Sequence, residues 1–156
     1  MLYKLNNLKG MIMDDLGKKW YVLLADTYAL YLKTQNYHWH VKGPQFKSLH
    51  GLFELQYQEL AEAVDAIAER LLIMGHKAPA TFKEYDRLKT ISDGDSSAPA
   101  NQMLIDLASD HKSLINDLNQ TMALAQKMND EGSANLLGDR ISAHEKAHWM
   151  LKTSTE

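Results

Sequence analysis

Apolar residues recur at intervals of three and four along most of the chain, and this periodicity predicts four long helices. The clearest should span Phe46 to Met74, because no Pro or Gly interrupts the pattern after Gly51. Its apolar positions are Leu49, Leu52, Phe53, Leu60, Val64, Ile67 and Leu71. A helix before it is expected from about Asp14 to Val41, with an apolar side of Trp20, Leu24, Tyr28, Tyr31 and Leu32. Two more are expected from Pro99 to about Met128 and from Ser133 to about Lys152.

The segments between these helices set their connectivity. Gly43-Pro44 predicts a tight turn between the first two helices, and Gly75 is typical of a C-cap at the end of the second. A long connection runs from about His76 to Ala98 and contains a short helix predicted over Phe82 to Lys89. Two helices, a long crossover and two more helices form an all-α four-helix bundle. The whole chain, 1–156, is expected to be one domain.

Composition narrows the compartment and the partners. The chain is 45% hydrophobic, yet no run of about 18 apolar residues exists and no charged-then-apolar leader opens it. With no Cys, these features predict a soluble protein of a reducing cytoplasm, without disulfides or thiolate-bound metal. The net charge is −3, and the first ten residues carry only Lys4 and Lys9. DNA binding is therefore doubtful, because affinity for nucleic acid depends on Lys and Arg at the phosphates.

The most informative residues are two imidazoles and two carboxylates that can bind a hard or borderline metal ion, namely His38, His50, Asp65 and Glu69. At about 100° per residue, the long helix places one stripe of such groups beside its apolar face, namely His50, Glu54, Asp65 and Glu69. His50 and Asp65 are nonetheless 15 residues apart, which is roughly 22 Å along the axis. The predicted turn before this helix should bring His38 next to His50, so that the imidazoles form one half-set and the acids another.

One chain cannot bring these half-sets together, which makes the pattern a prediction about assembly. A second copy packed antiparallel around a two-fold axis would place the imidazoles of one chain beside the carboxylates of the other. Such an axis creates two identical sites. Taken singly, each residue also has an ordinary explanation, because acids often lie on a solvated helix face and a buried His is often a hydrogen-bonded core residue.

Three stretches of the sequence resemble the signature of the Dps family, the ferritin-like DNA-protection-during-starvation proteins. They are Asn36-Tyr37-His38-Trp39-His40 with Gly43, Phe46 and Leu49-His50; Asp65-Ala66-Ile67-Ala68-Glu69-Arg70; and His144-Glu145-Lys146-Ala147-His148-Trp149-Met150-Leu151. The resemblance covers nearly the whole chain. It implies a ferritin-like four-helix subunit of a hollow homo-dodecamer, with the short crossover helix at a two-fold interface.

The same resemblance implies a function. Fe²⁺ would be oxidised by hydrogen peroxide or O₂ at ferroxidase sites between subunits, and ferric mineral would be stored in the cavity, which protects the cell from oxidative damage. By resemblance, the ferroxidase ligands are His38, His50, Asp65 and Glu69. Glu54 stands where the family often has a second-group acid, and Trp39 matches its tryptophan beside the iron, either as a sacrificial electron donor or as interface packing. Iron is the expected metal, with Zn²⁺ or another divalent ion as an alternative occupant.

Other motifs give competing interpretations. The stretch from His144 to His148 matches the H-E-x-x-H helix of zinc proteases, but only eight residues follow His148 to supply a third ligand. The simpler interpretation is a partly exposed polar face of the last helix. Glu145 and His148 also form one Glu-x-x-His pair, whereas di-iron bundles use two, and this favours the shared site. A further alternative is a Dps-like shell with a mainly DNA-binding or structural role and little ferroxidase activity.

Acids near the start of the last helix are candidates for an entry route. Asp130 and Glu131, with Asp139 further on, could line a three-fold pore for Fe²⁺, because a ring of acids concentrates cations. The alternative is a solvated helix start, where acids complement the helix dipole.

Two groups of residues carry no functional assignment. The histidines without an evident partner set are His40, His76 and His111. The tyrosines at helical spacing are expected to be packing residues, namely Tyr21, Tyr28, Tyr31 and Tyr37.

Overall fold

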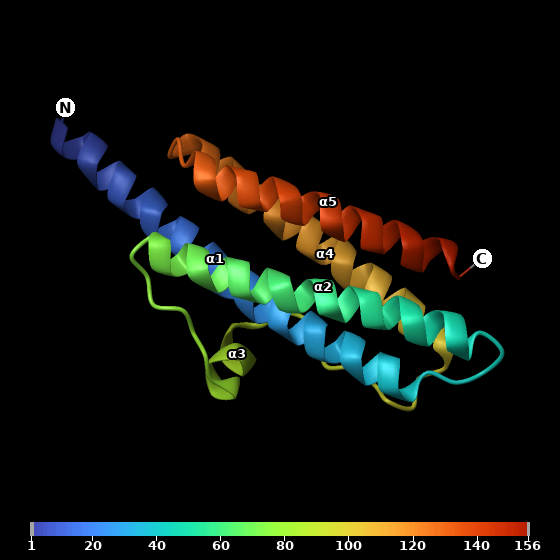
Figure 1. The fold of residues 1–156 in the computed structure, drawn as a ribbon. Helices are drawn as coiled ribbons and strands as arrows, with labels where there is room; N and C mark the ends of the chain where they lie inside the picture. Colours follow the sequence, from blue (N-terminus) through green and yellow to red (C-terminus); the bar gives the residue numbers. More distant parts are fainter. Residues whose placement is uncertain (1, 156) are drawn as a thin grey trace.

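The computed structural model describes residues 2–155, with side chains described from Asp15 onward. This part of the chain contains no strand and folds into the helices α1 (Leu2–His40), α2 (Phe46–Ile73), α3 (Phe82–Leu88), α4 (Ala100–Lys127) and α5 (Glu131–Thr153). Figure 1 shows α1 paired with α2 and α4 paired with α5, while α3 lies in the crossover on the outer side of α1. The prediction of an all-α bundle with a short crossover helix is confirmed.

Three details of the predicted helices are wrong. The first helix begins at Leu2 rather than near Asp14, because no Pro lies between these two positions to stop it. The last begins at Glu131, directly after its cap, rather than at Ser133. Leu32 was expected to face the bundle, but it is 48% exposed and borders a cavity between α1, α3 and the crossover.

The core is formed by the apolar sides of the four long helices. Trp20 of α1, Phe53 of α2 and Leu107 of α4 are fully buried, and each such side chain contributes about 1.5–3 kcal/mol of hydrophobic stabilisation. Five of the predicted apolar positions of α2 are buried, namely Leu49, Phe53, Leu60, Ile67 and Leu71. Their burial leaves the ligand stripe of α2 outside the core. No helix in the described part of the chain is long and apolar enough to cross a membrane.

Two glycines in the left-handed backbone region shape the ends of α2. Gly43, with φ +106°, allows the tight reversal from α1 into α2. Gly75, with φ +86°, follows the last turn of α2, and its amide donates to the Leu72 carbonyl while the next amide, of His76, donates to the Leu71 carbonyl. This pair of bonds is a Schellman motif, so the predicted helix end at Gly75 is confirmed.

The long crossover is fixed to the bundle by buried polar contacts. The Asp26 carboxylate on α1 accepts hydrogen bonds from the Thr90 amide at 2.6 Å, the Thr90 hydroxyl at 2.7 Å and the Ile91 amide at 3.0 Å. Further along, the Asn36 side chain donates to the Gly94 carbonyl at 3.0 Å. These contacts satisfy backbone groups that have no helix partner, and they fix the crossover against α1.

A second set of linked polar side chains lies in the interior between α2, α4 and α5. Glu59 pairs with the buried Arg140 guanidinium, whose Nη2 lies 3.2 Å from His144 Nε2. His144 Nδ1 in turn lies 2.8 Å from His111 Nδ1. Both imidazoles are almost completely buried, so the expectation that His144 belongs to a partly exposed polar face is wrong. His148 is not part of this line of contacts. Its Nδ1–H donates to the Ala108 carbonyl oxygen at 2.8 Å.

Glu59→Leu should cost more stability than Arg140→Met. The first change leaves a buried guanidinium without its counter-charge, and we expect a loss of about 3 kcal/mol, at the low end for a broken buried pair because Glu59 is half-exposed. The second removes the buried charge itself and leaves Glu59 free to be hydrated, so the loss should be about 1 kcal/mol. Urea unfolding measures both, with Glu62→Leu on the exposed side of α2 as the control. Equal losses would contradict this ranking.

Candidate metal centre

His38 and His50 lie against each other across the α1–α2 turn. Their rings are stacked with centroids 3.7 Å apart and planes 18° from parallel. His38 Nδ1 lies 2.8 Å from the His50 carbonyl oxygen, and His50 Nδ1 lies 2.8 Å from the His38 carbonyl oxygen. The turn therefore joins the two imidazoles through a reciprocal pair of hydrogen bonds, as the predicted hairpin requires.

These hydrogen bonds determine which nitrogen of each ring can bind a metal. A carbonyl oxygen only accepts, so each Nδ1 must carry the proton and donate it. In a neutral imidazole the other nitrogen, Nε2, then has a free lone pair. Metal-binding histidines are commonly oriented in this way, by an Nδ1–H bond to a backbone carbonyl or carboxylate. His38 and His50 thus each keep Nε2 available as a metal ligand, in two rings that stack on each other.

The carboxylates lie elsewhere on α2. Asp65 and Glu69 are exposed near its C-terminal end, roughly 22 Å along the axis from His50 at the other end, while Glu54 lies one turn beyond His50. Within the described residues, no three His, Cys, Asp or Glu side chains converge tightly enough to hold a metal ion. Of the predicted ligands, the structure brings together the imidazole half-set, and the carboxylate half-set lies apart from it on the same helix.

Aromatic side chains surround the imidazole pair. The Phe46 ring lies 5.0 Å from the His50 ring, and the Tyr57 ring lies 5.2 Å from the His38 ring, edge to face. Trp39, next in sequence to His38, is 60% exposed. His38 itself is buried while His50 is partly exposed, so the pair lies at the edge of the core with one side open.

The three pore candidates occupy different environments. Asp130 is the N-cap of α5, where its carboxylate accepts from the Ser133 amide at 3.1 Å and pairs with Arg70. Partial burial opposes ionisation, but the Ser133 hydrogen bonds and the Arg70 charge together hold the pKa of Asp130 below its usual value. These contacts give Asp130 the helix-start role that was the alternative to a pore. Glu131 and Asp139 are exposed.

Comparison with known proteins gives this geometry a family. A family model described as a ferritin-like domain matches residues 22–156. The "DNA protection during starvation protein 2" of Bacillus anthracis is 39% identical over 129 residues, which are 83% of this chain and 88% of that protein. The chain belongs to the Dps family of ferritin-like proteins. The Dps resemblance of the sequence is therefore confirmed.

Solved structures agree with this assignment. Dps from Thermosynechococcus elongatus superposes with a TM-score of 0.92 at 26% identity, over 96% of this chain and 95% of that one. A Dps protein from Vibrio cholerae gives a TM-score of 0.89 at 28% identity, over 94% and 92% of the two chains, and is described as a member of a broad superfamily of ferritin-like diiron-carboxylate proteins. The four-helix core of this Dps chain is thus a ferritin-like fold.

Sequence reasoning missed the polar residues inside the bundle. His111 was left without a partner and Arg140 was not considered, yet both belong to the chain of contacts that ends at Glu59. Helical spacing was the available signal, because Arg140 and His144 lie one turn apart on the apolar side of α5.

Proposed function

We propose that this Dps protein oxidises Fe²⁺ at sites shared between two subunits and stores the ferric product inside a hollow homo-dodecamer. The observation that supports it most strongly is the reciprocal hydrogen bonding of His38 and His50, which leaves the Nε2 of each ring free, while no three potential ligands converge within the described residues. Imidazole is a borderline ligand that suits iron, and carboxylates supply the hard oxygens that stabilise its oxidised form.

The proposed site combines the two half-sets across a two-fold axis. His38 and His50 of one subunit face Asp65 and Glu69 of the partner, because two antiparallel α2 helices place the start of one beside the end of the other. Glu54, one turn from His50, would hold a second iron more weakly or through water. Zn²⁺ or another divalent ion could occupy the same donors, since imidazole and carboxylate do not exclude it.

In the proposed reaction, Fe²⁺ is the substrate. Two ferrous ions give one electron each to hydrogen peroxide, or O₂ accepts the electrons, and the ferric ions lose protons from bound water and deposit as mineral. This chain's role is to hold the substrate ion with neutral imidazoles and anionic carboxylates, which favour the higher charge of the product. Exposed Glu131 and Asp139 are candidates to draw Fe²⁺ toward the interior. Removing free Fe²⁺ and peroxide together would protect a cytoplasm from oxidative damage.

An anomalous-scattering experiment tests the location of the site. Crystals exposed anaerobically to Fe²⁺ should give an iron-edge peak within bonding distance of His38 and Asp65 from different subunits. The peak should vanish in crystals of His38→Ala. A His40→Ala variant is the matched control, because His40 is exposed, two residues away, and bonds only the Asn36 carbonyl with its Nδ1. A peak on the imidazoles with no carboxylate from a neighbouring subunit would end the proposal.

A further inference from the structure

The guanidinium of Arg140 lies at a point between α2 and α5 where ligand-type groups converge. It pairs with both carboxylate oxygens of Glu59, and its Nη2 is 3.1 Å from Glu59 Oε2. The same Nη2 is 3.2 Å from His144 Nε2. Arg140 is buried, whereas the Glu59 side chain is half-exposed. One nitrogen of a fixed cation therefore contacts both a carboxylate and an imidazole.

The His144 ring is oriented as a metal-binding histidine is. Because arginine only donates, the lone pair of His144 Nε2 must point at the guanidinium. The proton of the ring is then on Nδ1, which donates to His111 Nδ1 at 2.8 Å. Metal-bound histidines are held in the same way, by a hydrogen bond from the ring nitrogen that does not bind the metal. His144 is thus an oriented nitrogen donor whose partner is a side-chain cation.

A third ligand-type group lies on α2, one turn before Glu59. Gln56 is only 8% exposed, yet neither its amide oxygen nor its amide nitrogen has a hydrogen-bond partner among the described residues. Leaving a buried polar group unpaired costs about 1–3 kcal/mol. Gln56, Glu59 and His111 line one cavity of about 410 Å³ between α2, α4 and α5. The Gln56 amide oxygen is therefore a spare oxygen donor beside a space that can admit an ion.

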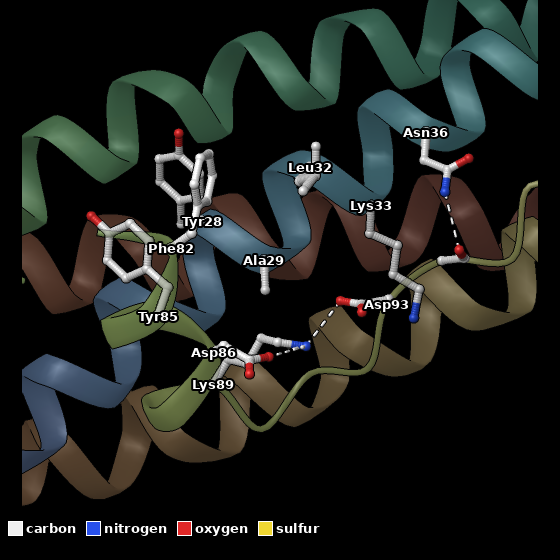
Figure 2. A pocket seen from close by; sticks show the side chains of 11 residues that line it. Tyr28, Ala29, Leu32, Lys33, Asn36, Phe82, Tyr85, Asp86, Lys89 and Asp93 are labelled. Carbon is white, nitrogen blue, oxygen red and sulfur yellow. Dashed lines mark hydrogen bonds and ion pairs between the residues drawn. The ribbon is translucent and has the colours of Figure 1, made fainter. Parts of the chain in front are cut away.

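This cavity lies on a different side of the subunit from the cavity drawn in Figure 2. The cavity of Figure 2 lies between α1, α3 and the crossover, whose short helix is expected at the two-fold interface. On α2, Gln56 and Glu59 are roughly 130° or more around the helix axis from the middle of the stripe that contains His50 and Asp65. Packing two α2 helices through that stripe therefore leaves the cavity beside Gln56 uncovered.

We propose that Arg140 occupies a metal position inside the bundle and keeps Fe²⁺ out of it. The guanidinium always carries its charge, so the position is filled by a cation at every pH at which the protein is folded. One imidazole nitrogen, one carboxylate and one amide oxygen would otherwise suit a divalent cation such as Fe²⁺, Co²⁺ or Zn²⁺. The role of this exclusion rests on the proposed function, because it confines Fe²⁺ to the shared site at His38 and His50.

The distances show why a metal ion can replace the guanidinium but cannot join it. A divalent ion binds carboxylate oxygen and imidazole nitrogen at about 2.0–2.2 Å, so an ion at the place of Nη2 needs Glu59 and His144 each to approach by about 1 Å. The half-exposed Glu59 side chain has the freedom to do so. With Arg140 present, no three His, Cys, Asp or Glu side chains in the described part of the chain are close enough to hold a metal ion.

Cobalt binding to variants of position 140 tests the proposal without any oxidation step. All proteins in this test also carry His38→Ala, which removes the proposed shared site. Arg140→Ala should bind one more Co²⁺ per chain than the protein that keeps Arg140, by equilibrium dialysis and visible absorption. Adding His144→Leu should abolish this binding. Arg140→Lys is the matched control, because it keeps a positive charge beside Glu59 and should bind no additional Co²⁺.

Cobalt-edge anomalous scattering should place the additional ion at His144 Nε2. Arg140→Ser vacates the same space with a polar side chain and repeats the test if Arg140→Ala does not assemble. Assembled particles of either variant that bind no additional Co²⁺ would overturn the proposal. In the unaltered protein, a cobalt peak at His144 beside Arg140 would overturn it as well, because the guanidinium would then exclude nothing.

Anaerobic Fe²⁺ soaks of Arg140→Ala crystals with His38 intact separate this inference from the proposed function. Both hold if iron-edge peaks appear at the shared site and at His144. A peak at the shared site alone would refute the role of Arg140 and leave the proposed function standing. A peak at His144 alone would refute the shared site while supporting the metal position inside the bundle.

Discussion

Chains carrying His38→Ala and chains carrying Asp65→Ala should each oxidise Fe²⁺ at a small fraction of the normal rate, whereas oligomers co-assembled from equal amounts of both should regain roughly a quarter of it. In a shared site, the imidazoles come from one subunit and the carboxylates from its partner. A site is intact only when the Asp65→Ala chain supplies the imidazoles and the His38→Ala chain supplies the acids. Random pairing gives each condition a probability of about one half, hence about one site in four.

A second mixture separates this outcome from general effects of co-assembly. His38→Ala mixed with His50→Ala should regain nothing, because both changes damage the same half-set and every site then receives a defective pair. Initial rates of Fe²⁺ oxidation, measured on particles of equal size, compare the two mixtures. If activity is absent from both mixtures, or present in both, the shared arrangement is wrong. The variants should fold normally. Asp65 is exposed, and the reciprocal hydrogen bonds between His38 and His50 lie at the edge of the hydrophobic core rather than inside it.

The long helices were predictable because apolar residues recur in each of them at intervals of three and four positions. In α2, burial of Leu49, Leu60 and Ile67 follows directly from their spacing. The start of α1 was misplaced although Leu2, Leu5, Leu8 and Ile12 recur at helical spacing, because spacing and propensity set helix boundaries poorly. Leu32 was misplaced for a related reason, since periodicity cannot distinguish a side facing the bundle from one facing the crossover.

The candidate site was only half predictable from one chain. Spacing and the Gly43 turn placed His38 beside His50, and the structure adds the reciprocal hydrogen bonds that orient both rings. The proposed carboxylate half would come from a second subunit, so Asp65 and Glu69 stay predictions. The line of buried polar contacts was missed because Arg140 was not considered and His144 was expected on a partly exposed helix face, while in the fold each buries its polar group against a specific partner.

The direction of the hydrogen bonds that link Arg140, His144 and His111 determines the charge of the two histidines. An arginine only donates, so His144 Nε2 must accept from Arg140, and its proton lies on Nδ1, where it is donated to His111 Nδ1. Both rings are then neutral. Burial, with smaller effects from the neighbouring Arg140 and His148, lowers the pKa of His111 to about 3. Burial also lowers the pKa of His144, with added effects from His111 and Arg140. The Glu59 carboxylate does not offset this, because it is already paired with Arg140.

Stability should therefore fall steeply as the pH drops below about 6.5. The unfolded chain binds protons at these histidines near pH 6.5, whereas the folded chain resists binding until about pH 3 for His111. Between these values the unfolded state holds more protons, so the stabilisation present at neutral pH is progressively lost on acidification. At about 1.4 kcal/mol per pH unit, His111 alone accounts for about 3 kcal/mol at pH 4.5, a large share of a typical folding free energy.

Urea unfolding at a series of pH values from neutral to 4.5 tests this expectation, with circular dichroism as the signal. The double variant His111→Leu/His144→Leu should show a much shallower decline, even if its stability at pH 7 is lower, because the two groups that resist protonation are gone. His40→Gln is the control for removing an exposed histidine, and it should keep the decline of the original protein. A double variant that loses stability with acid as steeply as the original protein would show that the buried histidine pair is not the acid-sensitive element, and would point instead to the carboxylate of Asp130, whose pKa is held below its usual value.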